Sequence, residues 1–234
     1  MTPNNRLLAL ATTAWLVTAV PAARAAIAIA ASLDQKVENA ASIVLGKCIK
    51  TESRMDPTGR WILTYSTFEV QKSLKGVAGP QITIVTPGGT VGSTHQDTIG
   101  VPEFHEGAEH VIFVKNSRVG PTVLYFDQGA YDVTTDGHGD KIVAPIPSNL
   151  VKVDSQRGMA VAPNDTPRTM RDFEKAVSDS IRESSARKAR MDMLAAEKAR
   201  KEQASLRSIL NRNWLVIMFA LAGIALATWQ LLRR

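Results

Sequence analysis

The chain has 234 residues, of which 28 are Lys or Arg and 22 are Asp or Glu, and its formal net charge is +6 at pH 7. The charge is unevenly distributed: residues 33–150 contain 10 basic and 13 acidic side chains, whereas residues 151–212 contain 14 and 9. These net charges of −3 and +5 place the basic character in the second segment, and its position next to an apolar C-terminal run favours anionic lipid over nucleic acid as its partner. The single cysteine, Cys48, excludes an internal disulfide, so the fold must depend on its hydrophobic core.

Residues 1–25 have the pattern of a secretory signal peptide. Arg6 precedes an uncharged apolar run that ends at Pro21, and small-residue cleavage options follow after Ala25 and as far as residue 30. An uncleaved signal anchor is the alternative, because the alanine-rich run continues beyond these options. Both interpretations predict that the following domain is exported.

Residues 33–150 are predicted to form a mainly β, exported domain. A short amphipathic helix beginning at Ser32 is expected first. Runs rich in Val, Ile, Tyr and Phe then alternate with turn residues, which is typical of short strands. The predicted strands are residues 41–53, 61–74, 81–86, 109–115, 122–126, 130–134 and 141–144. Such a series predicts a small antiparallel OB-like barrel or sandwich.

The segment after the β domain is predicted to be a polar linker, residues 151–165, followed by a basic helical stalk, residues 166–213. Thr166 is expected to cap this helix, with Pro167 at its first position. From position 168 onward there is no Gly or Pro for 55 residues, so one long helix is expected. Four residues near its start form an apolar stripe for docking against the β domain or a partner helix: Met170, Phe173, Val177 and Ile181.

Residues 214–232 form an uncharged run of nineteen residues, which predicts a C-terminal transmembrane helix followed by a short basic tail, residues 233–234. Basic residues are more numerous before this run than after it, which taken alone favours a cytoplasmic stalk. We expect the signal peptide, rather than this charge bias, to determine the orientation of the chain in the membrane. The prediction is a bacterial cell-membrane protein with a single C-terminal span and an extracytoplasmic main domain, periplasmic or extracellular. Membrane lipid is then an expected partner, through Trp214–Leu232 and the basic stalk.

The stretch FHEGAEH, residues 104–110, has some of the letters of a zinc-protease motif. Its two His residues are five positions apart, and on a helix five positions turn through about 500°, so the rings would point about 140° apart. A turn that leads into a strand is therefore the preferred interpretation. A zinc site formed by His95, His105 and His110 is the alternative, because these residue types suit zinc although their spacing matches no known motif. No cofactor is expected otherwise.

The glycine-rich segment 87–103 is long for a loop inside a compact domain, and loops of this kind are usually functional. It lacks the Lys-Ser/Thr pair and the following helix of a phosphate-binding loop. Ser93, His95 and Asp97 are close in sequence, but a catalytic triad needs side chains that converge from separate elements. The predicted ligand-binding residues are Gly88, Gly89, Val91, His95, Asp97 and Phe104.

Four motifs together resemble a group of uncharacterised exported bacterial domains: IVLGK at 43–47, TFEVQKSLKG at 67–76, TPGGTVG at 86–92, and G-x-P-x-F-x-x-G-x-E from Gly100. That group is similar to the OB-like barrels of netrin modules and tissue inhibitors of metalloproteinases. The resemblance implies the fold and the exported location. Those inhibitors bind the protease zinc through a mature N-terminal Cys, which is missing here, so their mechanism is not implied.

The sequence as a whole predicts a membrane-anchored extracytoplasmic module without catalytic activity. Such a module would bind a protein or cell-envelope partner, or assemble with a membrane complex. Two alternatives stay open. One is a metal-binding protein or metal-dependent hydrolase that uses His95, His105 and His110, and the other is a protease inhibitor built on an OB-like barrel.

Overall fold

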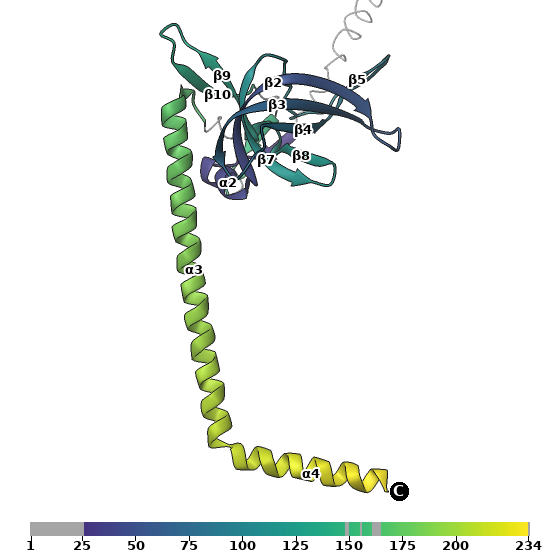
Figure 1. Ribbon diagram of the computed structural model, residues 1–234, viewed down its shortest axis with the longest axis vertical. Coiled ribbons are helices and arrows are strands. Elements are labelled where there is room, and N and C mark those ends of the chain that lie inside the picture. Colours follow the sequence, from purple (N-terminus) through teal and green to yellow (C-terminus); the bar gives the residue numbers. More distant parts are fainter. Residues whose placement is uncertain (1–25, 148–149, 155, 161–164, 234) are drawn as a thin grey trace, which may run out of the picture. The chain divides into compact units, whose positions relative to one another are not determined.

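The computed structural model describes residues 26–147, 150–154, 156–160 and 165–233 (Figure 1). The chain divides into two compact units, of which the first ends at Ser180 and the second begins at Ile181. The predicted signal peptide, residues 1–25, lies outside the described residues.

The first unit is built on an eight-stranded sheet with the order β12-β10-β9-β7-β2-β3-β4, in which β8 also pairs with β7. All of its strand pairs are antiparallel. Its strands are β2 (Ser42–Met55), β3 (Ile62–Lys75), β4 (Gln81–Pro87), β7 (Glu109–Ser117), β8 (Gly120–Val123), β9 (Ala130–Thr135), β10 (Lys141–Pro145) and β12 (Arg168–Thr169). The prediction of a mainly β domain is confirmed.

The sheet does not close into the predicted barrel. Strand β4 lies beside β8, and a Cβ atom added at Gly120 would be only 3.3 Å from Cγ2 of Val85. Within the described residues no hydrogen-bonded ladder joins these two strands. Closure fails because β8 is only four residues long. The chain then enters a 3-10 helix, η1 (Phe126–Gly129), through Tyr125 and Phe126, whose φ angles of 54° and 60° are incompatible with a continuing strand.

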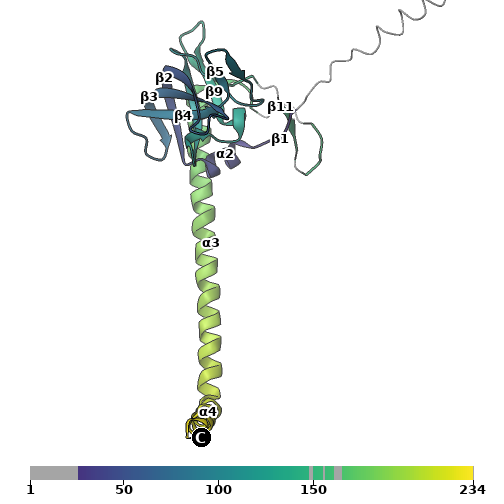
Figure 2. The same ribbon diagram turned by 90° about the vertical axis from the view of Figure 1, so that its right-hand side faces the viewer.

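Two further pairs of strands were not predicted. β1 (Ala26–Ile29) pairs in parallel with β11 (Leu150–Val153), which occupies the start of the predicted linker (Figure 2). β5 (Gly89–Val91) and β6 (Thr94–Gln96) form a short antiparallel hairpin inside the long glycine-rich segment. The segment predicted as a loop is therefore partly ordered by its own backbone hydrogen bonds.

Helix α2 (Leu33–Asn39) begins where the sequence predicts. Ser32 is its N-cap: the Ser32 hydroxyl accepts from the Gln35 amide at 3.2 Å, and the Ser32 amide donates to the Gln35 side chain at 2.9 Å. This reciprocal capping box satisfies two backbone N–H groups that the first turn leaves unpaired. The helix start is thus encoded locally.

Helix α3 (Met170–Arg212) is continuous over 43 residues, as predicted, but it begins later than expected. Thr166 and Pro167 lie before the helix, and Arg168–Thr169 pair with β10 as an edge strand. Thr169 supplies the cap instead, because its hydroxyl accepts from the Asp172 amide at 3.2 Å. The helix therefore starts later than predicted because residues 168–169 pair with the edge of β10.

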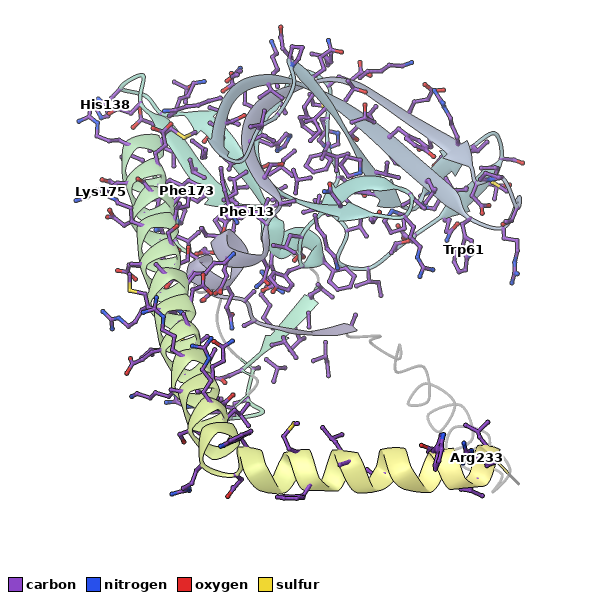
Figure 3. The ribbon with its side chains drawn as sticks, turned by 60° about the horizontal axis from the view of Figure 1, so that its bottom comes forward. Trp61, Phe113, His138, Phe173, Lys175 and Arg233 are labelled. Atoms are coloured by element: carbon purple, nitrogen blue, oxygen red, sulfur yellow. The ribbon has the colours of Figure 1, made fainter. Side chains whose placement is uncertain are left out.

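The hydrophobic core has two parts, one on each face of the sheet. On one face Val44, Cys48, Phe68, Ile84 and Ile112 form the centre of a buried cluster. On the other face Phe113 and Tyr131 of the sheet pack against Phe173 of α3, with ring centroids 6.3 and 5.1 Å from that of Phe173 (Figure 3). The first turns of α3 therefore belong to the β domain, and Phe173 and Val177 of the predicted apolar stripe are buried there.

A buried polar network ties α2 to the segment before α3. Lys36 is only 2% exposed, and its ammonium group contacts both the Tyr131 hydroxyl and the Asp165 carboxylate. The Tyr131 hydroxyl donates to the same carboxylate at 2.7 Å. Burial lowers the pKa of Lys36, because the apolar surroundings disfavour its charge. Burial acts to raise the pKa of Asp165, but the Lys36 charge and the two hydrogen bonds outweigh it, so this pKa is lowered.

The second unit comprises the rest of α3 and α4 (Trp214–Leu232). A helix is thus present over the residues predicted to cross a membrane. Among the helices of the described residues, however, none is both long and apolar enough to do so. The predicted transmembrane span is therefore not supported by the structure.

Candidate functional site

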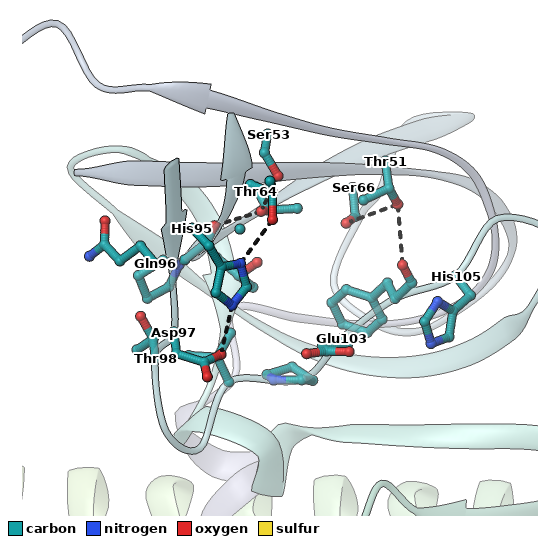
Figure 4. Close-up of a pocket in the computed structure, with 18 residues that line it drawn as sticks. Thr51, Ser53, Thr64, Ser66, His95, Gln96, Asp97, Thr98, Glu103 and His105 are labelled. Atoms are coloured by element: carbon teal, nitrogen blue, oxygen red, sulfur yellow. Dashed lines mark hydrogen bonds and ion pairs between the residues drawn. The ribbon is translucent and has the colours of Figure 1, made fainter. Parts of the chain in front are cut away.

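The long segment between β4 and β7 folds over the end of the sheet and encloses a cavity of about 320 Å³ (Figure 4). The floor comes from β2, β3 and β4, and the walls come from the β5–β6 hairpin and from residues 97–98 and 101–105. Five of the six predicted ligand-binding residues line this cavity: Gly88, Gly89, His95, Asp97 and Phe104. The sixth, Val91, lies on β5 but is not among the lining residues. The structure thus brings the predicted set together, and ligand binding by it stays a prediction.

The floor of the cavity is made of side-chain hydroxyls in cross-strand pairs. Thr51 lies opposite Ser66, and Ser53 lies opposite Thr64. The hydroxyl oxygens are 3.4 Å apart in the first pair and 2.8 Å apart in the second. Thr86 of β4, opposite Thr64, extends this surface to a third strand. Hydroxyls thus occupy one end of a sheet face whose other end is the apolar core.

A β-bulge places the β2 hydroxyls on this face. Cys48 pairs with Phe68, but the next pairs are Lys50 with Thr67 and Thr51 with Ser66, so β2 contains one extra residue at this point. Since side chains alternate along a strand, one inserted residue moves every later side chain to the opposite face. Without the bulge, Lys50 and Glu52 would point into the cavity. This floor was not predicted, although a Thr-x-Ser pattern occurs at both 51–53 and 64–66 of the sequence.

Gly88 and Gly89 allow the backbone to approach the hydroxyl floor. Gly89 has a φ of +127°, and a Cβ atom there would be 2.3 Å from the Ser53 hydroxyl and 2.4 Å from that of Thr64. The Thr64 hydroxyl donates to the Gly88 carbonyl at 2.7 Å. Only glycine is compatible with this combination of dihedral angle and close contact. The Gly-Gly pair is therefore required for the shape of the cavity rather than for phosphate binding.

His95 lies at the rim with a partner on each side of its ring. Nδ1 is 2.9 Å from the Thr90 hydroxyl, and Nε2 is 3.6 Å from Oδ1 of Asp97. This order resembles that of a nucleophile, a base and an acid. The side chains of His95 and Asp97 are nevertheless 62% and 91% exposed, so water competes for both and the second contact is long. Ser93, the hydroxyl residue considered from the sequence, does not line the cavity.

Phe104 separates this cavity from a second, larger one. Its ring is 6% exposed and makes edge contacts with Phe68 and His110, with centroid distances of 5.0 Å in both cases. Phe104 thus anchors the loop to the core. The second cavity, of about 830 Å³, is lined by His105, His110 and Asp132 together with residues of β7, β9 and β10.

His110 is buried at the edge of the second cavity. Neither ring nitrogen has a hydrogen bond of good geometry, although Nδ1 lies 3.1 Å from Oδ1 of Asp132. Burial lowers the pKa of His110, and the nearby Asp132 carboxylate opposes that effect without cancelling it. The histidine is therefore disposed to stay neutral among the aromatic rings.

The three predicted zinc ligands do not form one site. His95 lines the first cavity only, His110 lines the second only, and His105 lines both. In the part of the chain that the structure describes, no group of three or more His, Cys, Asp or Glu residues is arranged to hold a metal ion. The structure gives the zinc alternative no support.

Comparison with known proteins adds no assignment for this site. No protein-family model, curated protein or solved structure matches the chain. The function is therefore inferred from the residues of the cavity and their geometry.

Proposed function

We propose that the β domain is a non-catalytic binding module that holds a polar group of a protein or cell-envelope partner in the cavity beneath residues 87–105. The observation that carries this proposal is the cavity itself, which has a floor of paired hydroxyls and a rim of imidazole and carboxylate groups. Hydroxyls fixed on neighbouring strands are oriented before a ligand arrives, which lowers the entropy cost of binding. Pockets with a few convergent polar groups are the usual form of a binding site.

Binding rather than catalysis is favoured by the exposure of the rim. A general base depends on a partner that orients its ring and on surroundings from which water is excluded. Asp97 is almost fully exposed, and it is 3.6 Å from the ring that it would have to orient. The hydroxyls of Thr51, Ser53 and Thr64 are engaged with neighbouring hydroxyls or with the backbone rather than with a base.

We also propose that the protein is exported and contacts membrane lipid through its C-terminal part. The apolar N-terminal segment supports export, and the charge of +5 over residues 151–212 supports attraction to anionic headgroups. Helix α4 exposes large apolar side chains, including Phe219 at 76% and Leu232 at 87%, which lipid would cover. Flotation of the full-length chain with vesicles tests this, and lipid contact is ruled out if the protein stays at the bottom of the gradient.

The binding proposal is tested with a photo-crosslinking amino acid at position 98, which lines the cavity. We expect one discrete adduct in the exporting cell, and we expect Thr64→Val to weaken it by removing a floor hydroxyl. Thr67→Val is the matched control, because Thr67 lies on the same strand and pairs its hydroxyl with Thr83 at 3.1 Å, away from the cavity.

Two results would count against this proposal. Identical crosslinking from position 98 and from position 58, which lies in the β2–β3 turn, would show that the cavity has no specific partner. Turnover of an ester or peptide substrate that is lost on His95→Ala would show that the module is catalytic.

A further inference from the structure

We propose that the cavity binds a hydroxylated primary amine, the chemistry of an amino sugar with a free amino group. This inference rests on the proposed binding function and specifies its ligand. It depends on three features of the cavity: the direction of the hydrogen bonds in its floor, the charges on its lining, and the distribution of polar groups across it.

The hydrogen bonds of the floor leave acceptors facing the cavity. Thr64 donates its only hydroxyl proton to the Gly88 carbonyl at 2.7 Å. In the 2.8 Å contact between Ser53 and Thr64, Ser53 must therefore be the donor. Both protons are then used inside the floor, and Ser53 retains only lone pairs for a ligand. A ligand that meets the Ser53–Thr64 pair has to supply the hydrogen atoms.

The hydroxyls of two buried residues have hydrogen-bonding capacity that other protein groups leave unused. Ser66 is 1% exposed and Thr86 is 5% exposed, and both line the cavity. The Thr51 hydroxyl, which has one proton to donate, is 3.4 Å from both the Ser66 hydroxyl and the Phe104 carbonyl, so both contacts are weak. For the described residues there is no hydrogen bond donated by the Ser66 hydroxyl and none made by that of Thr86. Both residues line the cavity, so a ligand with its own hydroxyls would have these two as hydrogen-bond partners.

The charges of the lining favour a cation. Asp97 and Glu103 contribute two carboxylates, and no Lys or Arg is among the residues that line the cavity. A phosphate or carboxylate ligand would be repelled here, whereas an ammonium group offers three hydrogen-bond donors to carboxylates and lone pairs. His95 and His105, also at the wall, add a positive charge only when protonated.

The spread of polar groups favours a hydroxylated amine over a plain alkyl ammonium. Hydroxyls from β2, β3 and β4 cover the floor, so a ligand meets polar partners along its length rather than at one end. A lysine side chain would lay four methylene groups across that surface and leave its hydroxyls unpaired. An amino sugar offers both the ammonium group and the hydroxyls.

The test is a titration of the full-length chain with D-glucosamine, N-acetylglucosamine, glucose and n-butylamine, followed by NMR of the cavity amides. We expect glucosamine to bind most tightly, and N-acetylglucosamine, which has no charge, to bind more weakly. Asp97→Asn combined with Glu103→Gln should weaken glucosamine binding roughly fivefold, because exposed charges contribute modestly, and should leave glucose unaffected. Asp140→Asn removes a carboxylate that does not line the cavity and should change nothing.

The outcomes separate this inference from the function on which it rests. Equal affinity for glucosamine and N-acetylglucosamine overturns the role of the ammonium group, and tighter binding of n-butylamine overturns the role of the hydroxyls. If none of the four compounds binds while the position 98 adduct persists, the ligand class is wrong and the binding function stands. If the adduct is absent as well, both fail.

Discussion

Replacing Lys36 by Met tests the buried network that joins α2 to the segment before α3. Lys36 is 2% exposed and is paired with Asp165, which the Tyr131 hydroxyl also contacts. Removing the ammonium group leaves the Asp165 carboxylate, in a partly dry environment, with only the more distant Arg168 guanidinium, 3.8 Å away, as a counterion. Breaking a buried pair on one side costs about 3–5 kcal/mol, which for a unit of this size lowers the melting temperature by roughly 10 °C.

The matched control is Lys72→Met. Lys72 pairs with Glu174 at 2.7 Å and so also links the sheet to α3, but its side chain is 53% exposed. An exposed pair of this kind contributes about 0–1 kcal/mol. Urea unfolding of the full-length chain in detergent, followed by circular dichroism, gives both free energies. Replacing both buried partners, Lys36→Met with Asp165→Leu, should recover much of the loss because no uncompensated charge then remains.

The result that refutes this reasoning is a Lys36→Met variant no less stable than Lys72→Met. The Asp165 carboxylate would then have to be hydrated in the native state. The buried pair would contribute no more to the free energy of unfolding than an exposed pair does. A double variant less stable than Lys36→Met alone would instead show that the two side chains contribute through packing rather than through charge.

Three further predictions concern pH, the glycine pair and the bulge. Burial lowers the pKa of His110 from 6.5, so the unfolded chain binds this proton more readily than the folded chain does. The free energy of unfolding therefore has its full value above about pH 6.5. It falls as the pH drops below about 6.5, by at most ~1.4 kcal/mol per pH unit. His110→Phe should flatten that slope in unfolding experiments between pH 5 and pH 8, and an unchanged slope would assign the effect to another group. Gly89→Ala should destabilise the fold and abolish the position 98 adduct, because the new methyl group would meet the Ser53 hydroxyl at 2.3 Å. Gly59 also has a positive φ, of +69°, but open space around it, so Gly59→Ala should cost only about 1 kcal/mol and keep the adduct. Deleting Ile49 should remove the extra residue while Lys50 stays opposite Thr67 and Thr51 stays opposite Ser66, so the floor hydroxyls should keep facing the cavity and the position 98 adduct should persist; loss of the adduct with an intact β fold by circular dichroism would contradict this.

Features specified by near neighbours in the chain were predictable. Ser32 and Gln35 encode the start of α2, since both partners of the capping box lie within one turn. The turn between β2 and β3 is equally local: Asp56 accepts hydrogen bonds from the amides of Arg60 and Trp61, both at 2.9 Å. Strand positions followed from the alternation of apolar residues, and the length of α3 followed from a long run without Gly or Pro.

Features that depend on distant partners were not predictable. The start of α3 moved because Arg168 and Thr169 found the free edge of β10. The strand predicted at residues 122–126 ends early because the chain turns through Tyr125 and Phe126 into η1, and this also leaves the sheet open. Lys36 and Asp165 are 129 positions apart, and no local pattern links them.

The candidate site shows the same division. The sequence by itself determined that residues 87–105 are unusual, because their glycines, imidazoles and length do not suit a simple connection between strands. Only the tertiary structure decided what lies beneath them. A one-residue bulge after Cys48 sets the register that turns Thr51 and Ser53 toward Thr64 and Ser66. Register arises from pairing between strands, so neither strand alone carries the information that makes this surface polar.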